Sequence, residues 1–152
     1  MQTFLPYKHF RKTAAVLDNK RLGKQRVETK QILLALGVAV GPHAPAPLSR
    51  WRNHPAVKMW QGHEQLLAYY GLDVCVEWRS RCFRDTLAEQ FSAVISALDG
   101  PFVRPDWLDD ERLLASHRSN LLRKDPVFYG KYGWTEPPDL PYFWPTQEQI
   151  PA

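Results

Sequence analysis

Cysteine is scarce in this chain of 152 residues, and long apolar runs are missing from it. The two cysteines, Cys75 and Cys82, lie in a stretch of helical character, and a helix would separate them by about 10 Å of rise. Because that distance is too long for a disulfide, we expect a reduced, cytoplasmic protein. The absence of a long apolar run predicts no membrane-spanning helix, and the polar, basic start after Met1 predicts no secretory signal.

Motifs for metals and nucleotide cofactors are missing as well. The histidines do not have the HExxH spacing or another short ligand spacing, so we predict no metal site. Neither GxxxxGK[ST] nor GxGxxG occurs, which argues against a nucleotide cofactor, and the GxSxG nucleophile motif is absent too. An enzyme with this sequence is therefore expected to work without a cofactor, with an amine or water as nucleophile and a carboxylate as acid or base.

Aromatic residues and prolines are plentiful. The chain has seven Phe, six Trp and six Tyr, and a surplus of rings suits a protein that stacks on flat groups. Six of the 13 prolines follow residue 125, so we expect the chain after Lys124 to be loop-rich. The length suits one ordinary domain, and the apolar and charged fractions, 44% and 24%, are those of a folded protein.

Five stretches have the spacing of helices, and none alternates as a strand does. They are residues 13–36, 53–70, 72–83, 85–98 and 106–124. Thr13 is the expected N-cap of the first, Gly71 is expected to end the second, and Asp85 is expected to cap the fourth. We therefore predict an all-α fold, a single compact helical domain over 1–152 with an irregular, aromatic and proline-rich C-terminal tail over 136–152.

Positive charge is concentrated near the N-terminus. Residues 8–31 contain eight Lys or Arg against two acidic residues, although the whole chain has a net charge of only +4. Such a cluster is typical of phosphate binding, although a solvated helix face would look the same. Within it, Arg21, Lys24 and Glu28 share one helix face. The carboxylate is either placed there for chemistry or is one half of a surface ion pair.

Two further clusters could contact nucleic acid. Residues 50–55 (RWRNHP) place two guanidiniums, a ring, an amide and an imidazole at a predicted helix start, where phosphates bind well. Residues 125–134 (DPVFYGKYGW) combine four rings with Lys131, a pattern suited to base stacking. The alternative interpretations are an ordinary helix cap and a tail that packs its rings onto the core.

Three segments occur in the order seen in the pyrimidine-dimer DNA glycosylase/AP lyase family. They are Leu17–Glu28 (LDNKRLGKQRVE), Arg52–Pro55 (RNHP) and Asp125–Gly133 (DPVFYGKYG). By their order and spacing, the chain resembles a bacterial branch of that family from its N-terminus to about Trp134.

The resemblance implies a small all-α domain that removes a damaged pyrimidine from duplex DNA and then cleaves the strand at the abasic site. It matches the family's catalytic glutamate with Glu28. It also points to basic residues near Glu28, to a histidine at the next helix start and to the aromatic tail. With the clusters above, the predicted DNA-contacting residues are Arg21, Lys24, Arg26, Arg52, Asn53, His54, Tyr129, Lys131 and Tyr132.

The nucleophile implied by the resemblance is an N-terminal amine. An α-amino group has an unperturbed pKa of about 8, against about 10.4 for lysine, so much of it is neutral at working pH and can attack C1′ of the sugar. In the phage member of the family this amine is exposed when the initiator Met is removed from before Thr. Here Gln2 follows Met1 and normally blocks that removal, so the amine of Met1 is the candidate. A lysine, or water used with Glu28, is the alternative.

We therefore predict a DNA glycosylase, with AP-lyase activity, that acts on damaged or modified pyrimidines in duplex DNA. The main alternative is a non-catalytic DNA- or RNA-binding module that uses the same basic and aromatic residues. A helical protein-interaction domain is a third possibility. The sequence leaves the oligomeric state open, and a monomer is compatible with it.

Overall fold

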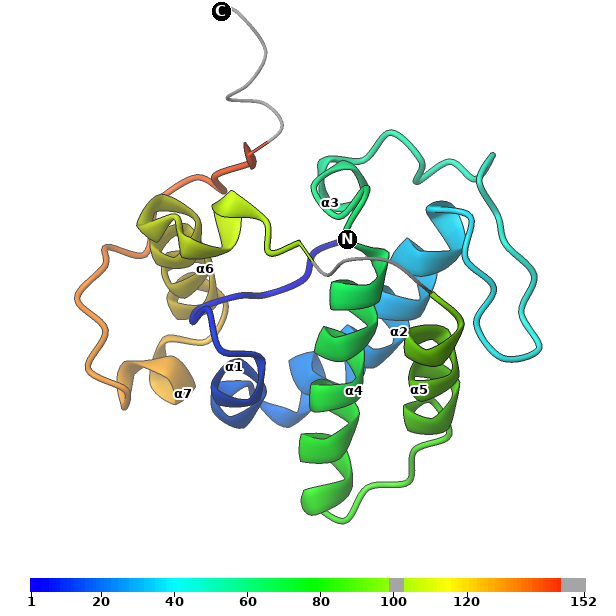
Figure 1. Ribbon diagram of the computed structural model, residues 1–152. Coiled ribbons are helices and arrows are strands. Elements are labelled where there is room, and N and C mark those ends of the chain that lie inside the picture. The colour runs from blue at the N-terminus through cyan, green and yellow to red at the C-terminus, as the bar shows by residue number, and fades with distance from the viewer. Residues whose placement is uncertain (99–102, 146–152) are drawn as a thin grey trace, which may run out of the picture.

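The computed structural model describes residues 1–98 and 103–145, and within them the fold is all-α, as predicted, with no strand (Figure 1). The elements are α1 (Phe10–Val16), α2 (Asn19–Ala35), α3 (Pro55–Lys58), α4 (Glu64–Ser80), α5 (Ala88–Ala97), the 3₁₀ helix η1 (Asp106–Asp109), α6 (Glu111–Lys124) and α7 (Pro126–Gly130). α4 packs against α1, α2 and α5, while α6 packs against η1 and α7. The predicted break at 99–101 and the tail beyond 145 lie outside the described residues.

The first predicted helix is in fact two helices. α1 and α2 are separated by Leu17, whose backbone is extended (φ −75°, ψ 141°). Asp18 restarts the helix, because its carboxylate accepts a hydrogen bond from the backbone N–H of Arg21 at 3.4 Å and so caps α2. Thr13 is not the predicted N-cap: it lies inside α1, and its hydroxyl bonds to the backbone of Tyr7.

The prediction that Gly71 ends a helix is wrong, and α4 continues through it. A Cβ at this position would lie 2.7 Å from Thr29 Cγ2 in α2 and 2.8 Å from Phe91 Cε2 in α5. The glycine therefore lets three helices approach one another closely. The break in this region comes earlier, at Gly62, whose φ of +84° is left-handed, and it separates the short α3 from α4.

The other two predicted helices are present, with later starts. The N-cap residue of α5 is Leu87 and not the predicted Asp85, but Asp85, two residues earlier, accepts hydrogen bonds from the backbone N–H groups of Leu87 and Ala88. The last predicted helix begins as the 3₁₀ turn η1 and restarts as α6 after Asp110, whose carboxylate caps it.

The loop-rich stretch after Lys124 also contains one short helix, α7, which was not predicted. Asp125 Oδ1 accepts a hydrogen bond from the backbone N–H of Phe128 at 3.1 Å, and Pro126 occupies the first turn. An acidic cap followed by proline is a helix-start signal, and five residues are enough for one turn.

The tail beyond α7 is irregular, as predicted, but its described part is fixed against α6. Ser119 Oγ accepts a hydrogen bond from the backbone N–H of Leu140 at 3.0 Å, and Asn120 Nδ2 donates to the carbonyl oxygen of Leu140 at 3.1 Å. Ser116 Oγ accepts from the backbone N–H of Phe143 at 3.1 Å. Three polar side chains of one helix thus replace regular backbone pairing for this segment.

Both cysteines are free thiols, Cys75 buried in α4 and Cys82 exposed just after it. Burial raises the pKa of Cys75 to about 12, so this thiol stays neutral and acts as a core residue. No helix in the described part of the chain is both long and apolar enough to cross a bilayer. Among the same residues, no group of three or more His, Cys, Asp or Glu side chains is placed to hold a metal ion.

The first residues of the chain are built into the core, where they run past α4 and α6 (Figure 1). Thr3 and Leu5 are fully buried. Thr3 Oγ1 accepts a hydrogen bond from Trp60 Nε1 at 3.0 Å, and the backbone N–H of Leu5 donates to Nδ1 of His117 in α6 at 2.8 Å. Side chains from α6 and from the turn after α3 therefore hold the segment that leads to the N-terminus.

His117 makes the stability of this arrangement depend on pH. It is completely buried, and burial lowers its pKa to about 3. An exposed histidine has a pKa of about 6.5, so between these values the unfolded chain binds a proton that the folded chain does not. The free energy of unfolding is therefore unaffected by His117 above about pH 6.5. It decreases as the pH falls below that value, by roughly 3 kcal/mol at pH 4.

Urea unfolding at pH 7 and pH 4 measures this loss. His117→Gln is the control, because the glutamine oxygen can accept the same hydrogen bond and does not titrate. We expect the wild type to lose roughly 3 kcal/mol more than this variant over that range. Equal losses in the two proteins would show that His117 does not set the acid sensitivity.

Candidate active site

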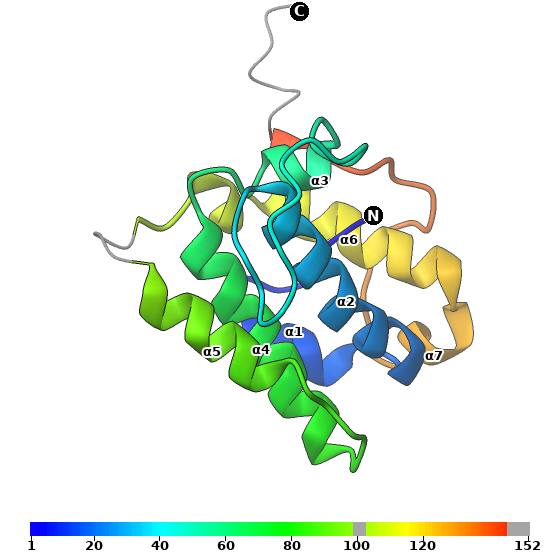
Figure 2. The same cartoon turned by 90° about the vertical axis from the view of Figure 1, so that its right-hand side faces the viewer.

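A pocket of about 410 Å³ opens beside the first residues of the chain. In Figure 2 the N-terminus lies between α2 and α6, which supply much of its wall. The lining residues are Met1, Gln2, Phe4, Lys20, Arg21, Lys24, Gln25, Glu28, Lys124 and Tyr142. Both predicted catalytic residues, Met1 and Glu28, are among them, together with the predicted DNA contacts Arg21 and Lys24.

Glu28 lies on the part of α2 that contacts the N-terminal residues. Its Oε2 accepts a hydrogen bond from Gln25 Nε2 at 3.0 Å, and the backbone N–H of Gln2 donates to the same oxygen at 3.4 Å. The α-amine of Met1 is only three covalent bonds from that N–H. Chain geometry therefore keeps the amine and the carboxylate in one place.

Gln25 holds this arrangement together, and no sequence prediction named it. It is 1% exposed, and both polar atoms of its side chain are used. Nε2 donates to Glu28 and to the carbonyl oxygen of Gln2 (3.0 Å), while Oε1 accepts from the backbone N–H of Phe4 (2.9 Å) and the hydroxyl of Tyr70 (2.7 Å). The sequence could have indicated this role, because Gln25 is a polar residue at a position of α2 where the helical spacing of apolar residues requires a core side chain.

The pocket is strongly cationic. Lys20, Arg21 and Lys24 line it from α2 and Lys124 lines it from the end of α6, with Glu28 as the one carboxylate in the lining. Partial burial lowers the pKa of Lys124, and the positive charges of Arg21 and Lys24 lower it further. Lys124, which is not among the residues predicted from the sequence, therefore belongs to the same electrostatic group. Four cations around one carboxylate suit the phosphates of a nucleic acid.

His54, the N-cap residue of α3, lies close in space to the N-terminal amine. Its Nδ1 accepts a hydrogen bond from the backbone N–H of Ala56 at 3.0 Å, and its ring is edge-on to Trp144 with the centroids 5.9 Å apart. Partial burial lowers the pKa of His54, and the positive charge of the Met1 ammonium group lowers it further. The predicted histidine and the predicted amine are therefore close enough to interact electrostatically.

Tyr142 enters the pocket from the tail and lies later in the chain than the predicted aromatic contacts, Tyr129 and Tyr132. Burial raises the pKa of its hydroxyl, and the charges of Arg123, Glu28 and Arg21 also act on it. The hydroxyl group is therefore within electrostatic range of the carboxylate and of the cationic residues. A tyrosine in an irregular, proline-rich segment carried no signal that could have identified it.

Two of the predicted DNA-contacting residues bind other side chains of the protein and do not line the pocket. Arg26 pairs with Asp85 at 2.6 Å, and its guanidinium lies 5.2 Å from the ring centroid of Trp78. Tyr129 is fully buried, its hydroxyl donates to the Asp18 carboxylate, and the backbone N–H of Asp18 donates to that hydroxyl at 3.0 Å. Both residues connect helices.

Four more of the predicted contacts are at other places. Arg52 and Asn53 line a separate polar hollow near the end of α2. At the end of α7, Lys131 Nζ lies 3.9 Å above the ring of Phe128, and Tyr132 packs on other rings of the same cluster. None of the four lines the pocket with Glu28, although Lys131 is exposed and open to an anionic partner.

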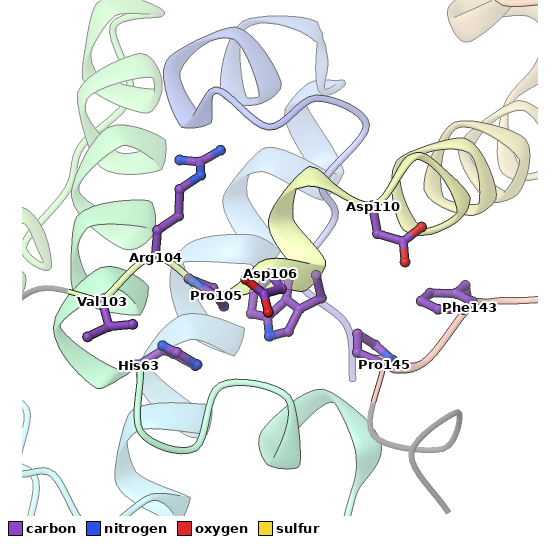
Figure 3. A pocket seen from close by; sticks show the side chains of 9 residues that line it. His63, Val103, Arg104, Pro105, Asp106, Asp110, Phe143 and Pro145 are labelled. Atoms are coloured by element: carbon purple, nitrogen blue, oxygen red, sulfur yellow. The ribbon is translucent and has the colours of Figure 1, made fainter.

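A second pocket, of about 400 Å³, differs in charge (Figure 3). Its lining residues are His63, Val103, Arg104, Pro105, Asp106, Trp107, Asp110, Phe143 and Pro145. Two carboxylates line it, and its one guanidinium, that of Arg104, is paired with Asp109 at 3.0 Å. It does not suit nucleic-acid phosphates, and it holds none of the predicted site residues.

The groups gathered beside Glu28 have complementary chemistry. A primary amine can attack an electrophilic carbon and form an imine, and a carboxylate can stabilise the positive charge that results and accept a proton. The surrounding cations can hold phosphates on either side of a reacting sugar. The pocket is therefore suited to chemistry on a nucleotide.

In a comparison with known families, the family described as pyrimidine dimer DNA glycosylase matches residues 1–90. The matched range contains Met1, Gln25, Glu28 and His54, whereas Lys124 and Tyr142 lie beyond it. A search of curated proteins and a search of solved structures found no match.

Proposed function

The chain belongs to the pyrimidine dimer DNA glycosylase family, and from that premise we propose that it is a DNA glycosylase with AP-lyase activity. It acts on damaged or modified pyrimidines, such as pyrimidine dimers, in duplex DNA. The amine of Met1 is the nucleophile, and Glu28 stabilises charge and then acts as a base. The observation that carries the proposal is that Gln2 and Gln25 join the amine-bearing residue to Glu28 within one cationic pocket.

Base release begins at C1′ of the damaged nucleotide. The neutral amine attacks C1′ with its lone pair, and the bond from C1′ to the base nitrogen breaks with its electrons leaving on the base, which takes up a proton. A proton moves from the amine nitrogen to O4′ as the sugar ring opens, which gives a protonated imine between Met1 and C1′. The carboxylate of Glu28 stabilises this positive charge.

Strand cleavage follows by β-elimination. Glu28 removes the C2′ proton, which the protonated imine has made acidic, and the electrons that are released expel the phosphate from C3′. Water then hydrolyses the imine and returns the free amine. Throughout, Lys20, Arg21, Lys24 and Lys124 hold the flanking phosphates, an interaction that salt should weaken.

A borohydride trapping experiment tests this mechanism. The protein is incubated with a duplex that carries one abasic site, and borohydride is added to reduce any imine to a stable amine. We expect a covalent protein–DNA adduct that peptide mass spectrometry assigns to Met1, and strand cleavage when borohydride is left out. An undamaged duplex is the control and should give neither.

Other outcomes would change the assignment in defined ways. An adduct on Lys124 would move the nucleophile to the lysine whose pKa burial lowers. Base release from a dimer-containing duplex without any adduct would indicate a water nucleophile. Binding to duplex DNA with neither adduct, cleavage nor base release would leave a non-catalytic binding module.

A further inference from the structure

Tyr70 is a fully buried residue of α4 whose hydroxyl group reaches the N-terminal segment. The hydroxyl oxygen lies 2.7 Å from Gln25 Oε1 and 2.9 Å from the carbonyl oxygen of Phe4, so its single proton is shared between two acceptors. Burial raises the pKa of this hydroxyl well above its usual value, and the negative charge of Glu28 raises it further. Tyr70 therefore keeps its proton and acts as a donor. It does not line the pocket, so it can affect a reaction there only through its neighbours.

The direction of the Gln25 amide is fixed by donors on one side and acceptors on the other. The backbone N–H of Phe4 and the hydroxyl of Tyr70 donate, so Oε1 must face them. Nε2 then faces the carbonyl oxygen of Gln2 and the carboxylate of Glu28, which accept. A flipped amide would place its NH₂ group against the N–H of Phe4 and its oxygen against two acceptors, and would leave these buried groups unpaired.

We propose that Tyr70 is a positioning residue for the reaction: it fixes the direction of the Gln25 amide, and the amide holds the Glu28 carboxylate and the backbone next to Met1. The inference rests on the proposed function. These two buried side chains join α4, α2 and the N-terminal segment, so the core sets where the amine and the carboxylate lie. A displacement of about 1 Å between reacting groups can cost on the order of 10²-fold in rate, and this network opposes such a displacement.

A double-mutant cycle tests whether Tyr70 acts through Gln25. The rate measured is single-turnover cleavage of a bound duplex with one abasic site. Tyr70→Phe adds no charge to the core and should slow cleavage about 2- to 10-fold, the effect of one hydrogen bond, with DNA affinity unchanged. Gln25→Met should slow it about 10- to 100-fold, and Tyr70→Phe should then have no further effect. Full additivity of the two losses, or an unchanged rate in either single variant, would overturn the inference.

The pH profile of Gln25→Glu separates positioning from a general loss of structure. A carboxylate at this position accepts from Phe4 and Tyr70 but cannot donate to Glu28, whereas a protonated carboxyl group does both. Burial and the nearby Glu28 raise the pKa of the introduced group. The cleavage rate, divided by that of the wild type at the same pH, should therefore be lowest at pH 8 and rise as the pH falls to 5. The other charged groups of the pocket are common to both proteins, so the ratio removes their titration: Met1, Lys20, Arg21, Lys24 and Lys124.

Gln65→Glu is the matched control. Gln65 is another glutamine that holds backbone in place, since its Nε2 donates to the carbonyl oxygens of Ile95 at 3.0 Å and Leu98 at 2.9 Å, and it does not line the pocket. Its ratio to the wild type should not change with pH. A constant ratio in Gln25→Glu, or the same rise in Gln65→Glu, would overturn the inference. A wild type that neither cleaves an abasic duplex nor releases a base would instead overturn the proposed function.

Discussion

Replacement of Glu28 by glutamine is expected to slow base release and strand cleavage by about 10²- to 10⁴-fold, with DNA binding close to that of the wild type. The amide has nearly the same shape, and its oxygen can still accept from Gln25 and from the backbone of Gln2. In the proposed mechanism, the substitution removes the negative charge beside the reacting sugar and the base that takes the C2′ proton. The measurement is single-turnover kinetics on a dimer-containing duplex and on an abasic duplex.

A control variant with the same change in net charge separates a catalytic role of Glu28 from a general change in the attraction between protein and DNA. Glu64→Gln also removes one negative charge, but Glu64 lies at the start of α4, where it accepts a hydrogen bond from the backbone N–H of Gly62. This variant should cleave like the wild type. If Glu28→Gln retained nearly full activity in both assays, the carboxylate would have only a structural role, and the catalytic assignment would fail.

Replacement of Asp85 by alanine should lower the free energy of unfolding by about 3–5 kcal/mol. The Asp85 side chain is fully buried between α2, α4 and α5. It accepts from Arg26 at 2.6 and 2.8 Å, from Arg79 at 3.1 Å, and from backbone N–H groups at the start of α5. Burial would raise the pKa of Asp85, but these hydrogen bonds outweigh it and hold the pKa below its usual value. Alanine leaves the guanidinium of Arg26, itself mostly buried, without a counter-charge.

Chemical denaturation measures this effect, and Glu89 supplies the control. Its carboxylate pairs with the same Arg79 at 2.7 Å but is 71% exposed. Exposed ion pairs contribute little, so Glu89→Ala should unfold at nearly the wild-type denaturant concentration. A loss in Asp85→Ala no larger than that in Glu89→Ala would contradict the expected role of the buried network.

Periodicity was enough to predict the helical fold, but it misplaced breaks that depend on single residues. Asp18 lies in a sequence that continues the helical pattern, and the structure shows that it starts a new helix by the extended backbone of Leu17 and the hydrogen bond from Arg21. Gly71 looks like a helix end in the sequence, yet its role is to let Thr29 and Phe91 approach the backbone of α4. Such contacts join residues that are distant in the chain, which no local pattern contains.

The sequence selected several residues that line one pocket, but it did not indicate the other residues of that lining. Glu28 stood out as a carboxylate within a basic cluster, and Arg21 and Lys24, which were predicted to share its helix face, line the same pocket. Arg26 and Tyr129 also lie in a basic or aromatic cluster of the sequence, but in the structure their side chains connect helices through Asp85 and Asp18. Charge and aromaticity indicate what a side chain could bind, and they do not indicate which face of the fold it will occupy.

The burial of residues 2–5 has a consequence for how the substrate range of this protein could diverge. The segment that follows the proposed nucleophile, Met1, is part of the core, so it has no freedom to adapt to a different base. Lys124 and Tyr142 enter the same pocket from the end of α6 and from the tail, outside the range that matches the family. New substrates could thus be acquired by altering the C-terminal third of the chain, while the reaction itself is inherited unchanged with the N-terminal part.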